Sequence, residues 1–149
     1  MLELIRTTSE NKDFVKLNTM LDKELAIRDG DDHAFFAQYN KIDTIKHVIL
    51  AYNEGIVVGC GAFKKFDEDS AEIKRMFVLP EGRGKKVASQ VLIELENWAR
   101  ETGFKSCILE TGASFKDALA LYRNSGYEVS ENYGQYKSVT SSVCFFKTL

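Results

Sequence analysis

A chain of 149 residues, with 44% hydrophobic residues and a single proline, predicts one compact globular domain over residues 1–149. Its formal net charge of −2 argues against a polyanionic partner such as nucleic acid or an acidic membrane surface. No stretch approaches the length of a membrane span, and the start of the chain lacks the apolar core of a signal peptide, so we expect a cytoplasmic protein.

The first half of the chain is predicted to alternate between strands and helices. A strand is expected at residues 2–6, helices at 11–27 and 33–40, and strands at 47–52, 56–64 and 71–78. The polar residues 28–32 are expected to form a turn. The tight turn Asn53-Glu54-Gly55 between two of the strands is typical of a β-hairpin.

The second half contains the strongest helix signal, over residues 85–102. Apolar residues from Val87 to Ala99 recur there at steps of three and four, and Gly103 follows where a left-handed C-cap is expected. A strand at 105–110, a helix at 116–124 and strands at 127–129 and 141–147 complete the pattern. A hairpin followed by a strand–helix–strand crossover predicts a mixed α/β sheet.

The cysteines and histidines of the chain form no metal or disulfide pattern. Cys60, Cys107 and Cys144 lie far apart in apolar runs, and His33 and His47 are fourteen residues apart. An odd number of cysteines without CxxC spacing argues against both a zinc site and a disulfide framework. We therefore expect inert, reduced core cysteines and no bound metal.

The strand at 71–78 is followed by Pro80 and a short loop rich in glycine and positive charge. The local cationic cluster consists of Lys74, Arg75, Arg83, Lys85 and Lys86. A glycine-containing loop before a long helix directs backbone N–H groups and positive charge toward one point, at the positive end of the helix dipole. The pattern predicts a site for a phosphorylated ligand, although a solvated basic turn would have the same composition.

This loop, Arg83-Gly84-Lys85-Lys86-Val87-Ala88, resembles the pyrophosphate loop Arg/Gln-x-x-Gly-x-Gly/Ala of the GNAT superfamily of acyl-CoA-dependent N-acetyltransferases. The segment from Ala118 through Tyr122 to Gly126 and Tyr127 resembles a later motif of that family, and residues 132–136 and 142–147 resemble the terminal hairpin of small bacterial-type members. Lys86 stands where glycine is usual, and Phe115 where asparagine is frequent. A lysine would keep the loop geometry only with a negative φ.

The resemblance implies a mixed, mostly antiparallel central sheet with a βαβ core and helices on both faces. It also implies acetyl-CoA as the cosubstrate, with pyrophosphate held by the loop amides and pantetheine laid beside the strand at 71–78, where a bulge would free main-chain groups. The cofactor-binding residues implied in this way are Met76, Phe77, Val78, Arg83, Gly84, Lys85, Lys86, Val87, Ala88, Ser89 and Tyr122.

Two residues are implied as catalytic. Glu72 occupies a family position that often holds the base for the amine, directly or through a water, but it also fits an exposed strand glutamate paired with a lysine. Tyr122 is the candidate acid for the departing thiolate, and alternatively a half-buried aromatic that packs the last helix on the sheet.

The acceptor site is implied to lie between the first helices and the terminal hairpin. The residues offered there are Asp29, Asp31, Asp32, His33, Phe36, Tyr39, Tyr133, Gln135 and Tyr136. Carboxylates beside aromatic rings suit a cationic amine, although the aspartates equally suit a turn and a helix N-cap. We expect a monomer or homodimer that acetylates a small primary amine in a ternary complex; the alternatives are a protein or peptide acetyltransferase and a non-catalytic acyl-CoA sensor.

Overall fold

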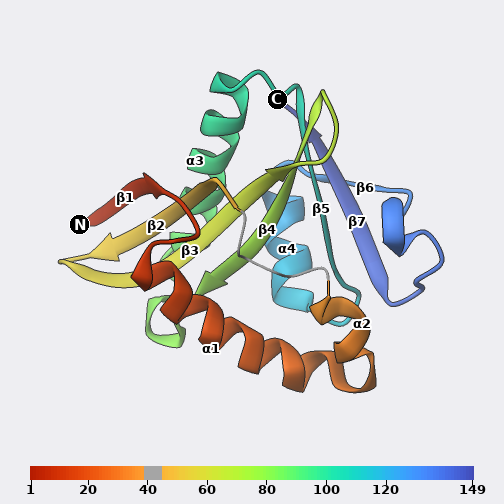
Figure 1. Ribbon diagram of the computed structural model, residues 1–149, viewed down its shortest axis with the longest axis horizontal. Helices are drawn as coiled ribbons and strands as arrows, with labels where there is room; N and C mark the ends of the chain where they lie inside the picture. Colours follow the sequence, from red (N-terminus) through yellow and green to blue (C-terminus); the bar gives the residue numbers. More distant parts are fainter. Residues whose placement is uncertain (39–44) are drawn as a thin grey trace. The chain divides into compact units, whose positions relative to one another are not determined.

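The computed structural model describes residues 1–38 and 45–149, and the chain divides into two compact units. Unit 1 comprises Met1–Lys64 and Ile73–Leu95, and unit 2 comprises Lys65–Glu72 and Glu96–Leu149. Hydrogen bonding orders the strands of the described residues as β1-β2-β3-β4 in unit 1 and β4-β5-β7-β6 in unit 2, with β4 (Ser70–Val78) contributing residues to both (Figure 1).

Unit 1 is built on antiparallel strands with helices on both faces. Its elements are β1 (Leu2–Thr7), α1 (Lys12–Asp29), the 3₁₀ helix η1 (Gly30–Asp32), α2 (His33–Ala37), β2 (His47–Asn53), β3 (Ile56–Lys65, but for its last residue), β4 from Ile73 on, η2 (Pro80–Gly82) and α3 (Val87–Glu101) up to Leu95. β2 pairs antiparallel with both β1 and β3. Helix α1 begins at Asn11, whose side chain accepts a hydrogen bond from the Asp13 N–H.

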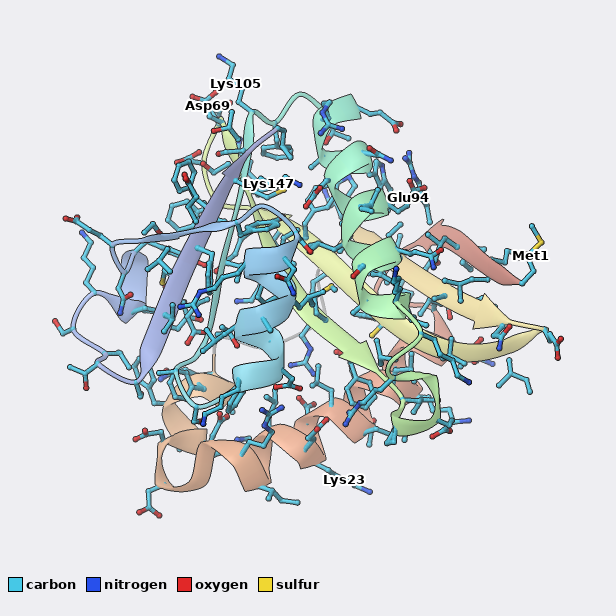
Figure 2. The ribbon with its side chains drawn as sticks, turned by 180° about the vertical axis from the view of Figure 1, so that it is seen from behind. Met1, Lys23, Asp69, Glu94, Lys105 and Lys147 are labelled. Atoms are coloured by element: carbon cyan, nitrogen blue, oxygen red, sulfur yellow. The ribbon has the colours of Figure 1, made fainter. Side chains whose placement is uncertain are left out.

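Helices α1 and α3 lie on opposite faces of β2 and β3 (Figures 1 and 2). On one face, Phe14 and Leu17 of α1 are fully buried in a core that includes Val48 and Leu50 of β2. On the other face, a Cβ atom at Gly61 of β3 would come within 2.9 Å of Leu95 Cδ1 on α3. A side chain at this position would therefore force side chains of the helix to move.

Unit 2 contains the parallel crossover and the last strands of the chain. Its elements are the first residues of β4, the end of α3, β5 (Ser106–Gly112), α4 (Lys116–Asn124), β6 (Glu128–Ser130), η3 (Gly134–Tyr136) and β7 (Ser142–Thr148). β5 pairs parallel with β4 and antiparallel with β7, which pairs on its other edge with β6. At one end of β5, Asp69 and Lys105 lie side by side with 3.8 Å between Oδ1 and Nζ (Figure 2).

The predicted order of strands and helices is confirmed, and so is a mixed, mostly antiparallel sheet with helices on both faces. Most boundaries differ by one to three residues, including those of three helices. Helix α1 continues to Asp29, and residues 30–32 form a 3₁₀ turn. Helix α2 ends at Ala37, and the rest of the predicted helix, Tyr39 included, falls outside the described residues. Helix α3 begins at Val87, two residues late, because Lys86 has a φ of +64° that no right-handed helix accepts.

Across the described residues, no helix combines the length and the apolar character needed to cross a membrane.

Candidate functional site

The cationic loop in unit 1 joins η2 to the start of α3. The Gly82 N–H donates to Leu79 O at 2.8 Å, and the Arg83 N–H donates to Pro80 O at 3.3 Å. These two amides are therefore used inside the turn, which differs from the expectation that the loop amides are free from Arg83 onward. The first-turn N–H groups of α3, at Val87, Ala88 and Ser89, lie where a helix leaves its donors without intrahelical partners. The Arg83 N–H is therefore not a free donor, whereas the N–H groups in the first turn of α3 are candidates to bind an anion.

The backbone of the loop turns left-handed twice before α3. Gly84 has a φ of +78° and Lys86 a φ of +64°, and both residues are exposed, as is Lys85. The expectation of a negative φ at Lys86 is therefore wrong: this lysine is in the left-handed region, at a cost of about 1–2 kcal/mol. Its side chain adds a charge next to the N-terminus of α3.

The Arg83 side chain turns back from the loop toward β4 and α1. Its Nε donates to Val78 O at 2.9 Å, and its Nη2 lies 3.2 Å from Glu24 Oε2 on α1. The guanidinium carbon is also 5.8 Å from the centre of the Phe77 ring. Arg83, which the sequence predicted to bind a phosphate, is thus already paired with the carboxylate of Glu24. Glu24 was not among the predicted site residues. Nothing in the local sequence signals it, because Glu24 and Arg83 are 59 residues apart.

Strand β4 carries a backbone irregularity just before the predicted pantetheine-binding residues. Arg75 has a φ of +60°, a value rare for a residue with a side chain. Of the three residues that follow, Phe77 packs in the core beneath α1, while a Cβ at Gly61 would meet Met76 Sδ, so Met76 faces the α3 side. The Val78 carbonyl accepts from Arg83.

Arg75 is not part of a surface cationic cluster, as its sequence neighbours suggested. It is 5% exposed and lies against α1, where Nε donates to Asn18 Oδ1 and Nη2 lies 2.6 Å from Asp22 Oδ1. Its Nη1 is buried and has no hydrogen-bond partner among residues 1–38 and 45–149. The left-handed backbone turns this cation inward and away from the loop.

In unit 2 the structure brings Glu72 of β4 together with Tyr133. The Tyr133 hydroxyl donates to Glu72 Oε2 at 2.7 Å, and the Tyr133 ring lies edge-on to Phe66 and Tyr136, with centroids 5.1 and 5.7 Å away. Burial, with the nearby charge of Glu72, raises the pKa of Tyr133 far above its ordinary value. The phenol is therefore a neutral donor to a half-buried carboxylate. A residue predicted to bind the acceptor is thus a direct partner of the candidate base.

Tyr122, on α4, is 6% exposed. Its ring contacts those of Tyr127 and Phe145, with centroid distances of 5.8 and 5.9 Å. Burial raises the pKa of its phenol. Across the part of the chain that the structure describes, its hydroxyl makes no hydrogen bond. Such a group keeps its proton at ordinary pH and is a weaker acid than an ordinary phenol.

Glu110 on β5 is a neighbour of this site that sequence reasoning missed. In the parallel register Glu72 is opposite Ile108, and Glu110 is two residues further, so both carboxylates are on the same face of the sheet. Ser142 of β7 donates to Glu110 Oε2 at 2.7 Å. Burial raises the pKa of Tyr136, and the charges of Glu110 and Glu72 act in the same direction. The alternation along the strand was the only available signal for Glu110.

Of the other predicted acceptor residues, Gln135 lies in η3 of unit 2 and the rest lie in the sequence range of unit 1. His33 Nδ1 is 3.5 Å from Asp29 Oδ2, and the Phe36 ring is edge-on to Phe35. Asp32 is exposed, whereas Tyr39 falls outside the described residues. The interpretation of the aspartates as helix caps is not supported at α2, because the Asp32 side chain makes no capping bond there.

The three cysteines are free and buried, as expected. Burial raises the pKa of both Cys60 and Cys107 to about 12, which leaves these thiols without nucleophilic character at neutral pH. Within the described ranges, no three acidic, histidine or cysteine side chains gather to hold a metal ion.

Comparison with known proteins places these features in context. The family model described as "Acetyltransferase (GNAT) family" matches residues 13–127. An aminoalkylphosphonate N-acetyltransferase of Salmonella typhimurium (strain LT2) is 35% identical over 138 residues, 86% of this chain and 86% of that protein. Four other curated relatives match over only 47% to 63% of their own length, so the chain spans about half of each.

Solved structures resemble the chain over its whole length. A Klebsiella pneumoniae protein assigned as an acyl-CoA N-acyltransferase has a TM-score of 0.83 at 27% identity, covering 100% of this chain and 98% of that one. PaiA N-acetyltransferase of Thermoplasma acidophilum, solved in complex with coenzyme A, has a TM-score of 0.70 at 18% identity and covers 100% and 99% of the two chains. At that identity the second likeness shows the fold alone.

Proposed function

Because this chain belongs to the acetyltransferase (GNAT) family, we propose that it transfers the acetyl group of acetyl-CoA directly to the primary amine of a small molecule, within a ternary complex. The observation that carries the proposal is the 2.7 Å hydrogen bond from Tyr133 to Glu72. It holds a half-buried carboxylate on β4, whose chain continues into the cationic loop.

Cofactor binding is assigned to the loop and the start of α3. The N–H groups of Val87, Ala88 and Ser89 and the positive end of the helix dipole suit a diphosphate, and the ammonium groups of Lys85 and Lys86 add charge. The fold neighbour solved with coenzyme A supports this assignment. Met76, Phe77 and Val78 would lie along pantetheine, and the irregular backbone at Arg75 supports a local departure from regular pairing there.

The chemistry requires two protons to leave the acceptor ammonium. Glu72 takes one, directly or through a water, and passes it to solvent, so that the neutral amine forms the N–C bond as the C–S bond breaks. The Val78 N–H would stabilise negative charge on the carbonyl oxygen. Tyr122 gives its proton to the departing sulfur and regains one from the product nitrogen through solvent. The sum is an amide, a free thiol and one released proton.

The decisive measurement is the release of free thiol from acetyl-CoA with a panel of amines. The panel holds a polyamine, amino acids, an aminoglycoside and a peptide N-terminus. It also holds aminoalkylphosphonates, because the Salmonella relative is named for them. We expect turnover with at least one small amine. Release only with the peptide supports the peptide alternative, and background rates with every amine despite acetyl-CoA binding support the sensor alternative.

The acid role is tested by Tyr122→Phe. We expect kcat to fall by about 10²-fold while acetyl-CoA affinity, measured by calorimetry, stays within about twofold, since general acid catalysis contributes about 10²–10⁴. The matched control is Tyr52→Phe, which removes a phenol hydrogen-bonded to Asp13 and is expected to leave kcat unchanged. Full activity of Tyr122→Phe would rule out this role.

A further inference from the structure

A buried polar network occupies the side of unit 2 formed by the end of α3, the turn after α4 and strand β7. Glu96 on α3 is 4% exposed, and each of its carboxylate oxygens has a donor. The Tyr127 hydroxyl donates to Oε2 at 2.9 Å, and Lys147 Nζ, on β7 (Figure 2), donates to Oε1 at 2.9 Å. None of these three residues is used by the mechanism above.

The network also fixes the turn that follows α4. Lys147 Nζ donates to the Ser125 carbonyl at 2.9 Å, and it lies 5.6 Å from the centre of the Tyr127 ring. Gly126 has a φ of +90°, and a Cβ there would lie 3.5 Å from the Lys147 side chain. The Ser125 carbonyl at the end of α4 and the Tyr127 ring thus both interact with one ammonium group.

Tyr127 connects this network to Tyr122. The Tyr127 N–H donates to Tyr122 O at 3.0 Å, and the two rings meet edge to face, 5.8 Å apart at an interplanar angle of 67°. Packing against the rings of Tyr127 and Phe145 contributes to the position of the Tyr122 side chain. The orientation of Tyr127, fixed at its far end by Glu96, is then transmitted to Tyr122.

We infer that Glu96 is a positioning residue for Tyr122, acting through the hydroxyl and ring of Tyr127. The inference rests on the proposed function, in which Tyr122 protonates sulfur. A buried ion pair contributes little net stability, because the loss of hydration offsets its attraction, so its contribution here is a defined geometry. Misplacement of a reacting group by about 1 Å can cost about 10²-fold in rate.

The test uses Tyr127→Phe, which keeps the ring and its packing but removes the bond to Glu96. We expect kcat to fall about tenfold, with the KM for acetyl-CoA within about twofold of wild type. In a Tyr122→Phe background the same substitution should lower kcat no further, because the group being positioned has lost its proton. An equal fall in both backgrounds, or no fall in wild type, would overturn the inference.

A readout that needs no turnover separates this inference from the proposed function. The flip rate of the Tyr122 ring, measured by aromatic NMR in the free protein, is expected to rise about tenfold in Tyr127→Phe, since the substituted ring has no hydroxyl to tether it to Glu96. An unchanged flip rate contradicts the positioning role. If the Tyr122 ring flips faster in Tyr127→Phe but Tyr122→Phe is fully active, Tyr122 is not the acid. The inference that Glu96 positions an acid is then also wrong. Glu96→Gln, which keeps one acceptor oxygen, should give an intermediate kcat.

Discussion

Glu24 forms an ion pair with Arg83, the arginine of the cationic loop that is predicted to bind a phosphate. The pair is partly exposed, with 45% of the Arg83 side chain and 30% of the Glu24 side chain accessible. Glu24 also lies 4.0 Å from Arg28, so it is shared between two cations. An anionic ligand that uses the Arg83 guanidinium must first compete with this carboxylate.

We therefore expect Glu24→Gln to tighten coenzyme A binding. Partly exposed pairs contribute about 0.2–1 kcal/mol, so removing the competing charge should lower the Kd by up to about fivefold, as measured by calorimetry at low salt. Glu10→Gln, an exposed residue without contact to Arg83, is the matched control and should leave the Kd unchanged. If Glu24→Gln binds coenzyme A no more tightly than Glu10→Gln does, then releasing Arg83 from Glu24 does not strengthen its interaction with the ligand.

At this scale, sequence reasoning succeeded where the signal is local. The position of the loop before α3 could be predicted because glycine and cations adjoin the start of this helix, while its role as a ligand site stays a prediction. The backbone at Lys86 was not, since lysine gives no sign that it will adopt a left-handed φ. The partners of Glu72 and Arg75 were also missed, because Tyr133 and Asn18 lie 61 and 57 residues away and only the fold brings them together.

At the scale of elements, α1 and β4 are joined by the buried guanidinium of Arg75. Asn18 uses both ends of its side chain in this joint: Oδ1 accepts from Arg75 Nε, and Nδ2 donates to Phe14 O at 2.7 Å. Asp22 takes a second N–H at the rim. Because Nη1 has no partner in the part of the chain that the structure describes, the joint depends on the acceptors of Asn18 and Asp22.

We expect Asn18→Ala to lower the free energy of unfolding by about 3 kcal/mol, because it leaves a second buried N–H of a charged group unpaired. Urea denaturation measures the loss. Thr19→Ala, next in sequence on the exposed side of α1, removes only a hydroxyl bonded to Val15 O and should cost less than about 0.5 kcal/mol. Equal losses in the two variants would show that the Arg75 joint contributes no stability of its own.

The order and type of the elements could be predicted because apolar periodicity is a property of neighbouring residues. Helix α4 was predicted at its observed bounds, Lys116–Asn124. Ends failed where one residue overrides the pattern, as Lys86 does at the start of α3. The position of β7 between β5 and β6 has no local signal, since it depends on which strand edges meet after the chain has turned.

At the scale of the whole molecule, ligand binding and folding are linked. A ligand that binds only the folded chain stabilises it by about 2.7 kcal/mol at a hundred times its Kd. For a chain of this size that corresponds to a rise in Tm of about 5–10 °C. Coenzyme A should therefore raise the Tm of the protein measurably.

Replacing Arg83 and Lys86 together by alanine should weaken coenzyme A binding at least tenfold and remove most of this rise in Tm. Calorimetry and thermal melts with and without coenzyme A check both effects. Lys16→Ala with Lys23→Ala, two exposed cations on α1, removes the same charge and should leave the Tm shift intact (Lys23 is labelled in Figure 2). Unchanged affinity in the Arg83 and Lys86 variant would overturn the loop assignment.

One domain over residues 1–149, a cytoplasmic location and a monomer or homodimer stay predictions.

The burial of all three cysteines makes the folded protein nearly silent toward thiol-specific dyes. With a pKa of about 12, Cys60 and Cys107 are ionised to about one part in ten thousand at pH 8, so they react far more slowly than a coenzyme thiol in water. Colour developed with such a dye can then be assigned to product. Without substrate, the same reagent measures the rate of unfolding, because each chain that unfolds exposes three reactive thiols.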